Sequence, residues 1–230
     1  MDLKTKDVAE LLNISETTVR RLSTEGKIPS YKINHQYRFN RSEIEDWVMQ
    51  KRHGGEREKS ELKKEIIPVA KSGNMQFSLY RALYRGAVLT KVPFNSKEEI
   101  IRHTMEYMAQ HFDLDAEVLT DLFLEREKLM PTSLSHGIGV PHTRDFLLNT
   151  HFDVIVTVYP DEPIEYGALD GQKVHTLFFL FASEDKCHLH LLAKLAHLSV
   201  DEKTRAFFCT KPSKERLLDY IKHWESALNA

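Results

Sequence analysis

A segment dense in charged residues divides the chain into two parts that must fold separately. Residues 54–75 open on Gly54-Gly55, alternate glutamate, arginine and lysine with few apolar residues, and contain Pro68. So few apolar side chains cannot bury the segment, although its middle can be transiently helical. We therefore predict a charged linker over residues 54–75, between a domain at residues 1–53 and a larger one at residues 76–230.

The composition is ordinary for a globular protein and excludes a membrane span. The chain has 230 residues, of which 41% are apolar and 29% charged, enough for two compact domains. Its longest apolar run, residues 177–182, is far shorter than the roughly 20 residues of a bilayer helix, and the N-terminus is polar. We therefore expect a cytoplasmic protein with no membrane partner. The net charge of −2 argues neither for nor against nucleic acid.

The first fifty residues show the pattern of a helix-turn-helix. Thr5 can cap a first helix and Ser15 a second, each with apolar residues at helical spacing. Asn13 lies between them and tolerates the left-handed conformation of a tight turn. On the second helix several polar side chains can face a major groove. These are Thr17, Thr18, Arg20, Arg21 and Thr24.

A hairpin and a third helix complete the first domain. We predict strands at 31–33 and 37–39 that pair across residues 34–36. In this pairing Lys32 and Arg38 share a polar face, while the apolar side chains share the other. Ser42 and Glu45 have the spacing of a capping box for the closing helix.

The run from Lys6 to Leu22, followed by Gly26-Lys27-Ile28-Pro29, resembles the winged helix-turn-helix of the excisionase and MerR-like families. The resemblance covers nearly all of residues 3–50 and implies binding of double-stranded DNA. Docking of a protein is the alternative function of such a module. Because one module is small, we expect a homodimer to be needed for a specific site. The DNA-binding residues would be Thr17, Thr18, Arg20, Arg21, Lys32 and Arg38.

Residues 76–230 alternate between helical and β patterns. Ser96 and Asp115 begin two amphipathic helices, and residues 183–185 open another. Segments 152–159 and 174–181 are apolar on both faces, which is typical of central strands covered by helices. The predicted fold is therefore a small winged helix-turn-helix, mainly α with a β-hairpin, followed by an α/β domain with a mixed central sheet covered by helices on both faces.

A single histidine, His142, follows a segment suited to anion binding. Gly137 and Gly139 allow backbone N–H groups to approach an anion, and Pro141 favours the end of a strand at His142. A neutral imidazole can attack phosphorus through a ring nitrogen. The alternative is a structural histidine at the end of a strand.

Two further cationic residues are candidates for the same site. Arg126 lies on the apolar side of its helix, unlike its neighbours Glu125 and Glu127, so its guanidinium needs an anion inside the protein. That anion is either a phosphate or an internal carboxylate. His188 lies in the first turn of a helix, where anions are favoured. The other polar side chains of that helix, His190, Lys194 and His197, are expected to face water.

Three motifs resemble the IIA domains of the bacterial phosphoenolpyruvate-dependent phosphotransferase system, of the fructose/mannitol type, with the nitrogen-regulatory branch closest. They are Glu125-Arg126-Glu127, the run from Gly137 to His142, and the run from His188 to Leu192, within a match over about residues 76–225. The resemblance implies that His142 accepts a phosphoryl group from an upstream histidine phosphocarrier (HPr-like), that Arg126 steadies the phosphate, and that His188 is the second active-site histidine. Such a domain is a phosphocarrier without a cofactor, not a turnover enzyme on a small substrate.

Three functional hypotheses follow. In the first, phosphorylation of the second domain controls DNA binding by the first. In the second, the protein is a DNA-binding transcriptional regulator whose IIA-like domain serves only dimerisation or partner binding. Ser133 and Ser135, where the family often has glycine, leave this open. The third, a metal-dependent hydrolase, lacks a carboxylate-histidine motif with ligand spacing, and His188 and His190 diverge on their helix, so we expect no metal site.

Overall fold

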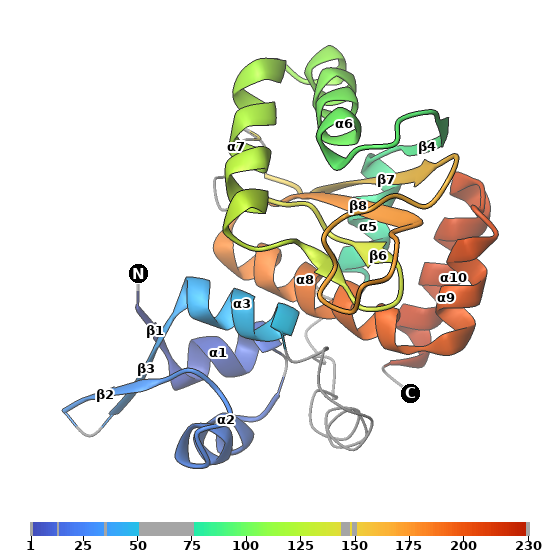
Figure 1. Cartoon of the computed structure of the whole chain (residues 1–230). Coiled ribbons are helices and arrows are strands. Elements are labelled where there is room, and N and C mark those ends of the chain that lie inside the picture. The colour runs from blue at the N-terminus through green and yellow to red at the C-terminus, as the bar shows by residue number, and fades with distance from the viewer. Residues whose placement is uncertain are drawn as a thin grey trace.

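The computed structural model describes residues 2–12, 14–34, 36–50, 76–143, 148 and 151–228. The predicted linker at 54–75 lies wholly outside the described residues, which resume at residue 76. The described parts form two domains that lie against each other (Figure 1). No helix among them is both long enough and apolar enough to cross a bilayer.

The described residues of the N-terminal domain form three short strands and three helices. A helix-turn-helix is present as predicted, and the Ser15 hydroxyl caps its second helix by accepting a hydrogen bond from Thr18 N. A first strand that the sequence analysis did not predict pairs with the last one, giving the order β1-β3-β2. The elements are β1 (Asp2–Lys4), α1 (Thr5–Leu12), α2 (Glu16–Thr24), β2 (Tyr31–Ile33), β3 (Gln36–Asn40) and α3 (Arg41–Gln50).

The hairpin has a different register from the predicted one. Lys32 pairs with Tyr37, and Tyr31 pairs with Arg38. Asn34 adopts a left-handed φ of 47°, and the tight turn that it forms brings Ile33 opposite Gln36. Lys32 therefore lies over the Tyr37 ring, 4.9 Å from its centroid, on the opposite face from Arg38. The prediction of one shared polar face was wrong, because a shift of one residue changes the face of every side chain.

The predicted capping box of α3 was also wrong. The cap is Asn40, whose side-chain oxygen accepts a hydrogen bond of 2.9 Å from Ser42 N. Glu45 is fully buried and lies beside Arg41, with 3.0 Å between its Oε1 and Arg41 Nε. The Glu45 carboxylate, in the second turn of α3, thus contacts the side chain of the first residue of the helix.

The C-terminal domain is an α/β fold. Ser96 and Asp115 cap α6 and α7 as predicted. Helix α5 and strand β4 were not predicted. The elements are α5 (Ser78–Arg85), β4 (Val88–Val92), α6 (Lys97–His111), α7 (Ala116–Leu129), β5 (Ser133–Leu134), β6 (Ile138–Gly139), β7 (Val154–Pro160), β8 (Thr176–Phe181), α8 (Asp185–Val200), α9 (Glu202–Cys209) and α10 (Lys214–Ala227).

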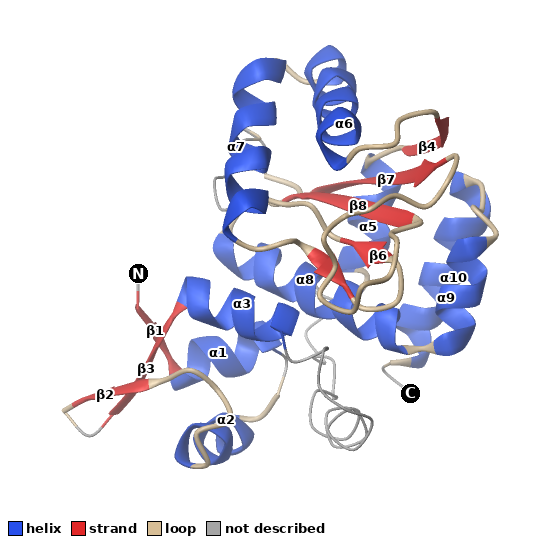
Figure 2. Ribbon diagram, in the orientation of Figure 1, coloured by secondary structure: helices blue, strands red, loops and turns tan. Residues whose placement is uncertain are grey.

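The sheet of this domain has the strand order β4-β7-β8-β6-β5. It is mixed, because β4 and β7 are parallel, β7 and β8 antiparallel, and β8 and β6 parallel. Every residue of β7 and β8 is buried, since α6 and α7 cover one face and α5, α8 and α10 the other (Figure 2). The predicted mixed sheet between two helical layers is confirmed.

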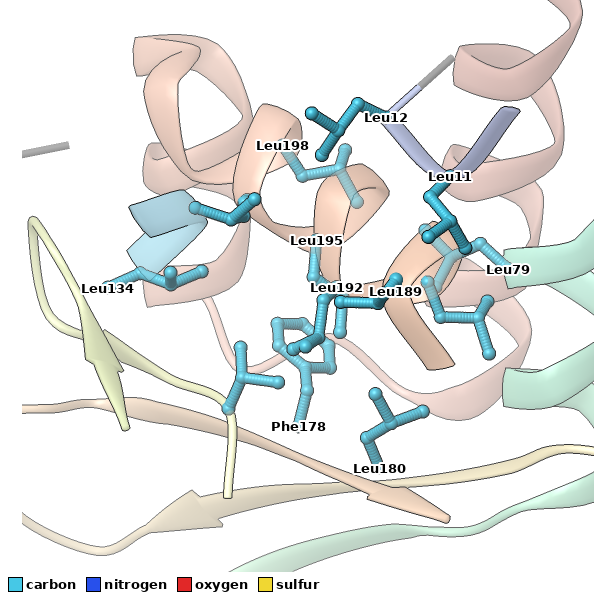
Figure 3. Close-up of a cluster of buried hydrophobic side chains, with 14 of the residues drawn as sticks. Leu11, Leu12, Leu79, Leu134, Phe178, Leu180, Leu189, Leu192, Leu195 and Leu198 are labelled. Carbon is cyan, nitrogen blue, oxygen red and sulfur yellow. The ribbon is translucent and has the colours of Figure 1, made fainter. Parts of the chain in front are cut away.

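The two domains share one apolar cluster. Leu11 and Leu12 of α1 belong to the same buried cluster as Leu195 and Leu198 of α8 (Figure 3). Helix α8 is therefore covered by the sheet on one side and by the N-terminal domain on another.

This packing overturns a prediction for α8. His190 and Lys194 were expected to face water, but both are buried. Lys194 Nζ forms an ion pair with Glu225 of α10 and donates to Ser78 of α5. Lys194 is buried because α5 and α10 of the same domain pack on its side of α8.

Candidate functional site

His142 lies at the edge of the sheet, two residues after Val140 and directly after Pro141. Its backbone forms a parallel bridge with Leu180 of β8, next to the hydrogen bond from Leu180 N to Pro141 O. The Nδ1 atom is 2.7 Å from Val140 O. Since a carbonyl oxygen only accepts, Nδ1 carries a proton, and in the neutral imidazole Nε2 then holds the lone pair. The imidazole is thereby oriented as a nucleophile through Nε2.

The segment before His142 is a tight hairpin of β5 and β6. Gly137 has a φ of 77°, and a Cβ there would come within 2.5 Å of the His175 ring. At Gly139 a Cβ would come within 2.6 Å of Leu177. Gly137 is therefore favoured by backbone conformation and packing, whereas a side chain at Gly139 would displace the end of Leu177. Ser133 pairs with Gly139 across the hairpin, and Ser135 is buried in its turn, so both serines fit this loop.

His188 lies directly against His142. The two ring centroids are 5.1 Å apart, with an angle of 69° between the ring planes. Each side chain is only 1% exposed. His188 comes from the first turn of α8 and His142 from the sheet edge, so the fold brings together two residues that are far apart in the sequence.

Arg126 is buried at the end of α7, as its helical position predicted. It donates a hydrogen bond of 3.0 Å to Met130 O. Its other terminal nitrogen is 3.5 Å from Asp46 Oδ1 on α3 of the N-terminal domain. A carboxylate of the other domain thus faces Arg126 in this structure, and its side chain is partly exposed.

Helix α3 places a second carboxylate at the histidine pair. Glu45 Oε1 is 3.7 Å from His188 Nε2. Arg41, which contacts the same oxygen, also forms an ion pair of 2.7 Å with Asp185 at the start of α8. Sequence reasoning missed Glu45 and Asp46 as site residues. One signal was available: Glu45 lies three residues before the buried Val48, on the apolar side of α3, where a charge needs a partner.

Comparison with known proteins places this arrangement in a family. Residues 83–224, more than half of the chain, match the family described as phosphoenolpyruvate-dependent sugar phosphotransferase system, EIIA 2. The chain belongs to this family. Residues 3–52 match a helix-turn-helix domain family. The predicted resemblance of both domains is confirmed.

Named relatives match the IIA domain over nearly their whole length. The chain is 29% identical over 146 residues to the nitrogen regulatory protein of Pseudomonas aeruginosa, covering 62% of this chain and 94% of that protein. It is 30% identical over 149 residues to the Escherichia coli nitrogen regulatory protein, covering 64% and 91%. The crystal structure of nitrogen regulatory protein IIA-Ntr from Neisseria meningitidis superimposes with a TM-score of 0.54 at 23% identity, covering 62% and 94%, which supports the fold.

A buried network holds the loop of the IIA domain that leads to His142. Glu127 accepts hydrogen bonds from the backbone N–H and the hydroxyl of Thr132 and from the Tyr166 hydroxyl. Burial raises the pKa of Glu127, which these hydrogen bonds oppose. Thr132 O in turn accepts from Val140 N, two residues before the histidine. The prediction that Glu127 faces away from the protein was wrong, because the chain after α7 folds back over this side of the helix.

The site of the IIA domain also has the donor atoms of a metal site. One ligand atom each from Glu45, His142 and His188 lies within 4.8 Å of the others. Such a set suits zinc by its chemistry. However, Arg41 Nε lies 3.0 Å from the Glu45 oxygen and would oppose a cation there. The absence of a metal therefore stays our prediction.

The predicted DNA-binding residues lie apart from the IIA site. Helix α2 and the β2–β3 hairpin are on the side of the N-terminal domain that points away from the IIA domain (Figure 1). Thr17, Arg20 and Arg21 are exposed on α2, and Lys32 is exposed on the hairpin.

Several of these side chains have partners within the N-terminal domain. Arg20 pairs with Glu16 at 3.0 Å, and Arg21 pairs with Glu25 at 3.2 Å. Such exposed pairs are weak enough for a phosphate to replace the glutamate. The half-buried Thr18 contributes instead to the cap, since its hydroxyl lies 2.9 Å from that of Ser15. The half-buried Arg38 donates to Gln36, next to it on β3.

Proposed function

We propose that this protein is a phosphorylation-responsive regulator, in which a phosphoryl group on His142 of the IIA domain controls DNA binding by the helix-turn-helix domain. One observation carries the proposal. Val140 O fixes the proton on Nδ1 of His142, so that Nε2 is a nucleophile beside the second imidazole of His188.

The proposed reaction is transfer between two histidines. His142 Nε2 attacks the phosphorus of a phosphohistidine on an upstream HPr-like phosphocarrier. A new N–P bond forms while the N–P bond of the donor breaks, and the donor imidazole leaves with the bonding electron pair. The Nδ1 proton of His142 stays on its hydrogen bond to Val140 O. Arg126 and His188 stabilise the charge on the transferring group without forming the bond.

Double-stranded DNA is the second proposed partner. The exposed face of α2 and the hairpin supply cationic groups for phosphates and donors for base edges. One such module covers few base pairs, so we propose that the protein acts on DNA as a homodimer.

Phosphoryl labelling tests the proposal. The full-length protein is incubated with phosphoenolpyruvate and the general phosphotransferase proteins, and acid-labile, alkali-stable phosphate is measured. We expect His142→Ala to abolish the label, while His188→Ala and His136→Ala keep it at a reduced or equal rate. Label that persists in His142→Ala but is lost in His188→Ala or His136→Ala would show that the assignment is wrong.

A second candidate is a DNA-binding regulator whose IIA domain only binds partners. The burial of His142, at 1% exposure, favours it because a phosphocarrier cannot reach this atom in the present arrangement. Under this alternative neither the wild-type protein nor any variant that exposes His142 takes up label.

A further inference from the structure

The face of the IIA domain that must receive a phosphoryl group is covered by α3 of the same chain. Glu45 is fully buried there, with its Oε1 3.7 Å from His188 Nε2 and a carboxylate oxygen within 4.8 Å of a ring nitrogen of His142. The next residue, Asp46, lies 3.5 Å from Arg126. The two carboxylates of α3 thus contact the groups that, in the proposed function, hold a phosphoryl group.

We propose that α3 is an internal competitor for the phosphoryl site, so that docking of the helix-turn-helix domain and phosphorylation of His142 exclude each other. This inference rests on the proposed function. The site is occupied by Glu45 and Asp46. Like the phosphoryl group with which they compete, these side chains present negatively charged oxygens to an arginine and a histidine.

Burial gives the first reason for exclusion. His142 and His188 are each 1% exposed and Arg126 is 4% exposed with α3 in place. In-line transfer requires the donor phosphorus to come close to His142 Nε2, at about 3–3.5 Å before reaction. A donor protein cannot do so until α3 has moved away.

Charge gives the second reason. A phosphoryl group brings about two negative charges at neutral pH. On His142 it would lie beside the buried Glu45 carboxylate, in a region with little water to screen the repulsion. Once attached, the group therefore prevents α3 from returning.

Other contacts hold the docked state in the absence of phosphate. Leu11 and Leu12 of α1 pack in one cluster with the leucines of α8 (Figure 3). Arg41 bridges Glu45 and Asp185, at 3.0 Å and 2.7 Å. Most of these contacts lie outside the phosphoryl site, so they hold the docked domain in place by themselves. The charge at His142 can then shift the equilibrium between the docked and undocked domain.

The exposed face of α2 does not change between the two states. Thr17, Arg20 and Arg21 are exposed with α3 docked. Release of α3 therefore changes how the DNA-binding domain is held relative to the IIA domain, and not whether α2 is accessible.

The first test compares two charge reversals on α3 in the full-length protein. Glu45→Lys sets a cation against Arg41 and His188 and should undock the domain. Glu43→Lys makes the same change at an exposed position of the same helix and serves as the control. We expect Glu45→Lys to accept phosphate at least about 5-fold faster than wild type, the lower end of usual coupling energies, and Glu43→Lys to match wild type.

The second test measures domain separation directly by small-angle X-ray scattering. We expect the radius of gyration of the wild-type protein to increase on phosphorylation, and that of His142→Ala to stay unchanged under the same treatment. Circular dichroism verifies that each variant is folded.

The outcomes separate the two proposals. If the wild-type protein takes up label but Glu45→Lys is no faster and the radius of gyration does not change, competition by α3 is wrong while the phosphocarrier function stands. If neither wild type nor Glu45→Lys takes up label, the phosphocarrier function fails and this inference fails with it.

Discussion

Arg126 and Glu45 each lie on the side of a helix that faces apolar neighbours, and each contacts a charged or titratable group of the other domain. Arg126 is 4% exposed and faces Asp46, and Glu45 is fully buried beside Arg41 and His188. Burial of a charge without a partner costs several kcal/mol, so such positions indicate either an ion pair or a ligand site. Here the ion pairs of the docked state and the proposed phosphoryl site use the same groups.

At the residue scale we predict that Arg126→Ala slows phosphoryl acceptance by about 10-fold or more, because one charge-stabilising donor is removed. The rate is measured for the Arg126→Ala, Glu45→Lys double variant and compared with that of Glu45→Lys alone. In this background the domain is already undocked, so loss of the Arg126–Asp46 contact no longer affects docking. Lys128→Ala, an exposed change on the same helix, is the control. An unchanged rate in the Arg126 variant would leave this arginine with a structural role alone.

Elements of the N-terminal domain divide between two faces. Helices α1 and α3 contact α8 of the IIA domain, while α2 and the β2–β3 hairpin point the other way (Figure 1). The proposed docking and DNA-binding functions therefore fall on different elements of one small domain. Changes in one can be made without changing the other.

At the element scale we predict that Arg20→Ala and Arg21→Ala on α2 each weaken binding of duplex DNA. Each phosphate contact that is lost should lower the slope of log affinity against log salt concentration by about 1, whereas loss of a base contact relaxes the sequence preference. The probe is a genomic fragment selected with the wild-type protein. Arg102→Ala, an exposed change on α6 of the IIA domain, should bind like wild type.

Two results would contradict the prediction that α2 binds DNA. If the full-length protein shifts no genomic fragment, or if the Arg20, Arg21 and Arg102 variants bind alike, the helix-turn-helix is a protein-docking module.

The whole molecule places the helix-turn-helix domain directly on the proposed phosphoryl site. The shared apolar cluster and the ion pairs of α3 make the two domains one unit in the docked state. A local charge change at His142 can therefore alter the position of the entire N-terminal domain, which is the form that many phosphorylation switches take.

At the scale of the whole molecule we predict that phosphorylation weakens operator binding. A released domain no longer holds a fixed spacing to its counterpart in a dimer, and the added charge of about −2 repels DNA. Fluorescence anisotropy of phosphorylated and unphosphorylated protein on the same operator, at low and at physiological salt, measures the change. The His142→Ala protein, given the same treatment, should show no difference. Equal affinities of the two wild-type forms would contradict the coupling.

Local interactions were predictable from the sequence because the groups involved are a few residues apart. The caps Ser15, Ser96 and Asp115 each bond backbone N–H groups two or three residues later, and their spacing determined where α2, α6 and α7 begin. The segments at 152–159 and 174–181, which are apolar on both faces, likewise predicted the central strands. The inward direction of Arg126 followed from helical periodicity alone.

Tertiary structure decided which of these elements meet. Nothing in the spacing of Ser42 and Glu45 distinguishes a capping box from a buried interdomain contact, because both use a carboxylate at the same position of a helix. The choice depended on α8, whose His188 is more than a hundred residues away in the sequence. The sequence by itself therefore determined two domains and a candidate histidine. The packing of α1 and α3 on α8 determined that the first domain covers the candidate site of the second. That packing could not be predicted, because contacts between distant segments have no local pattern in the sequence.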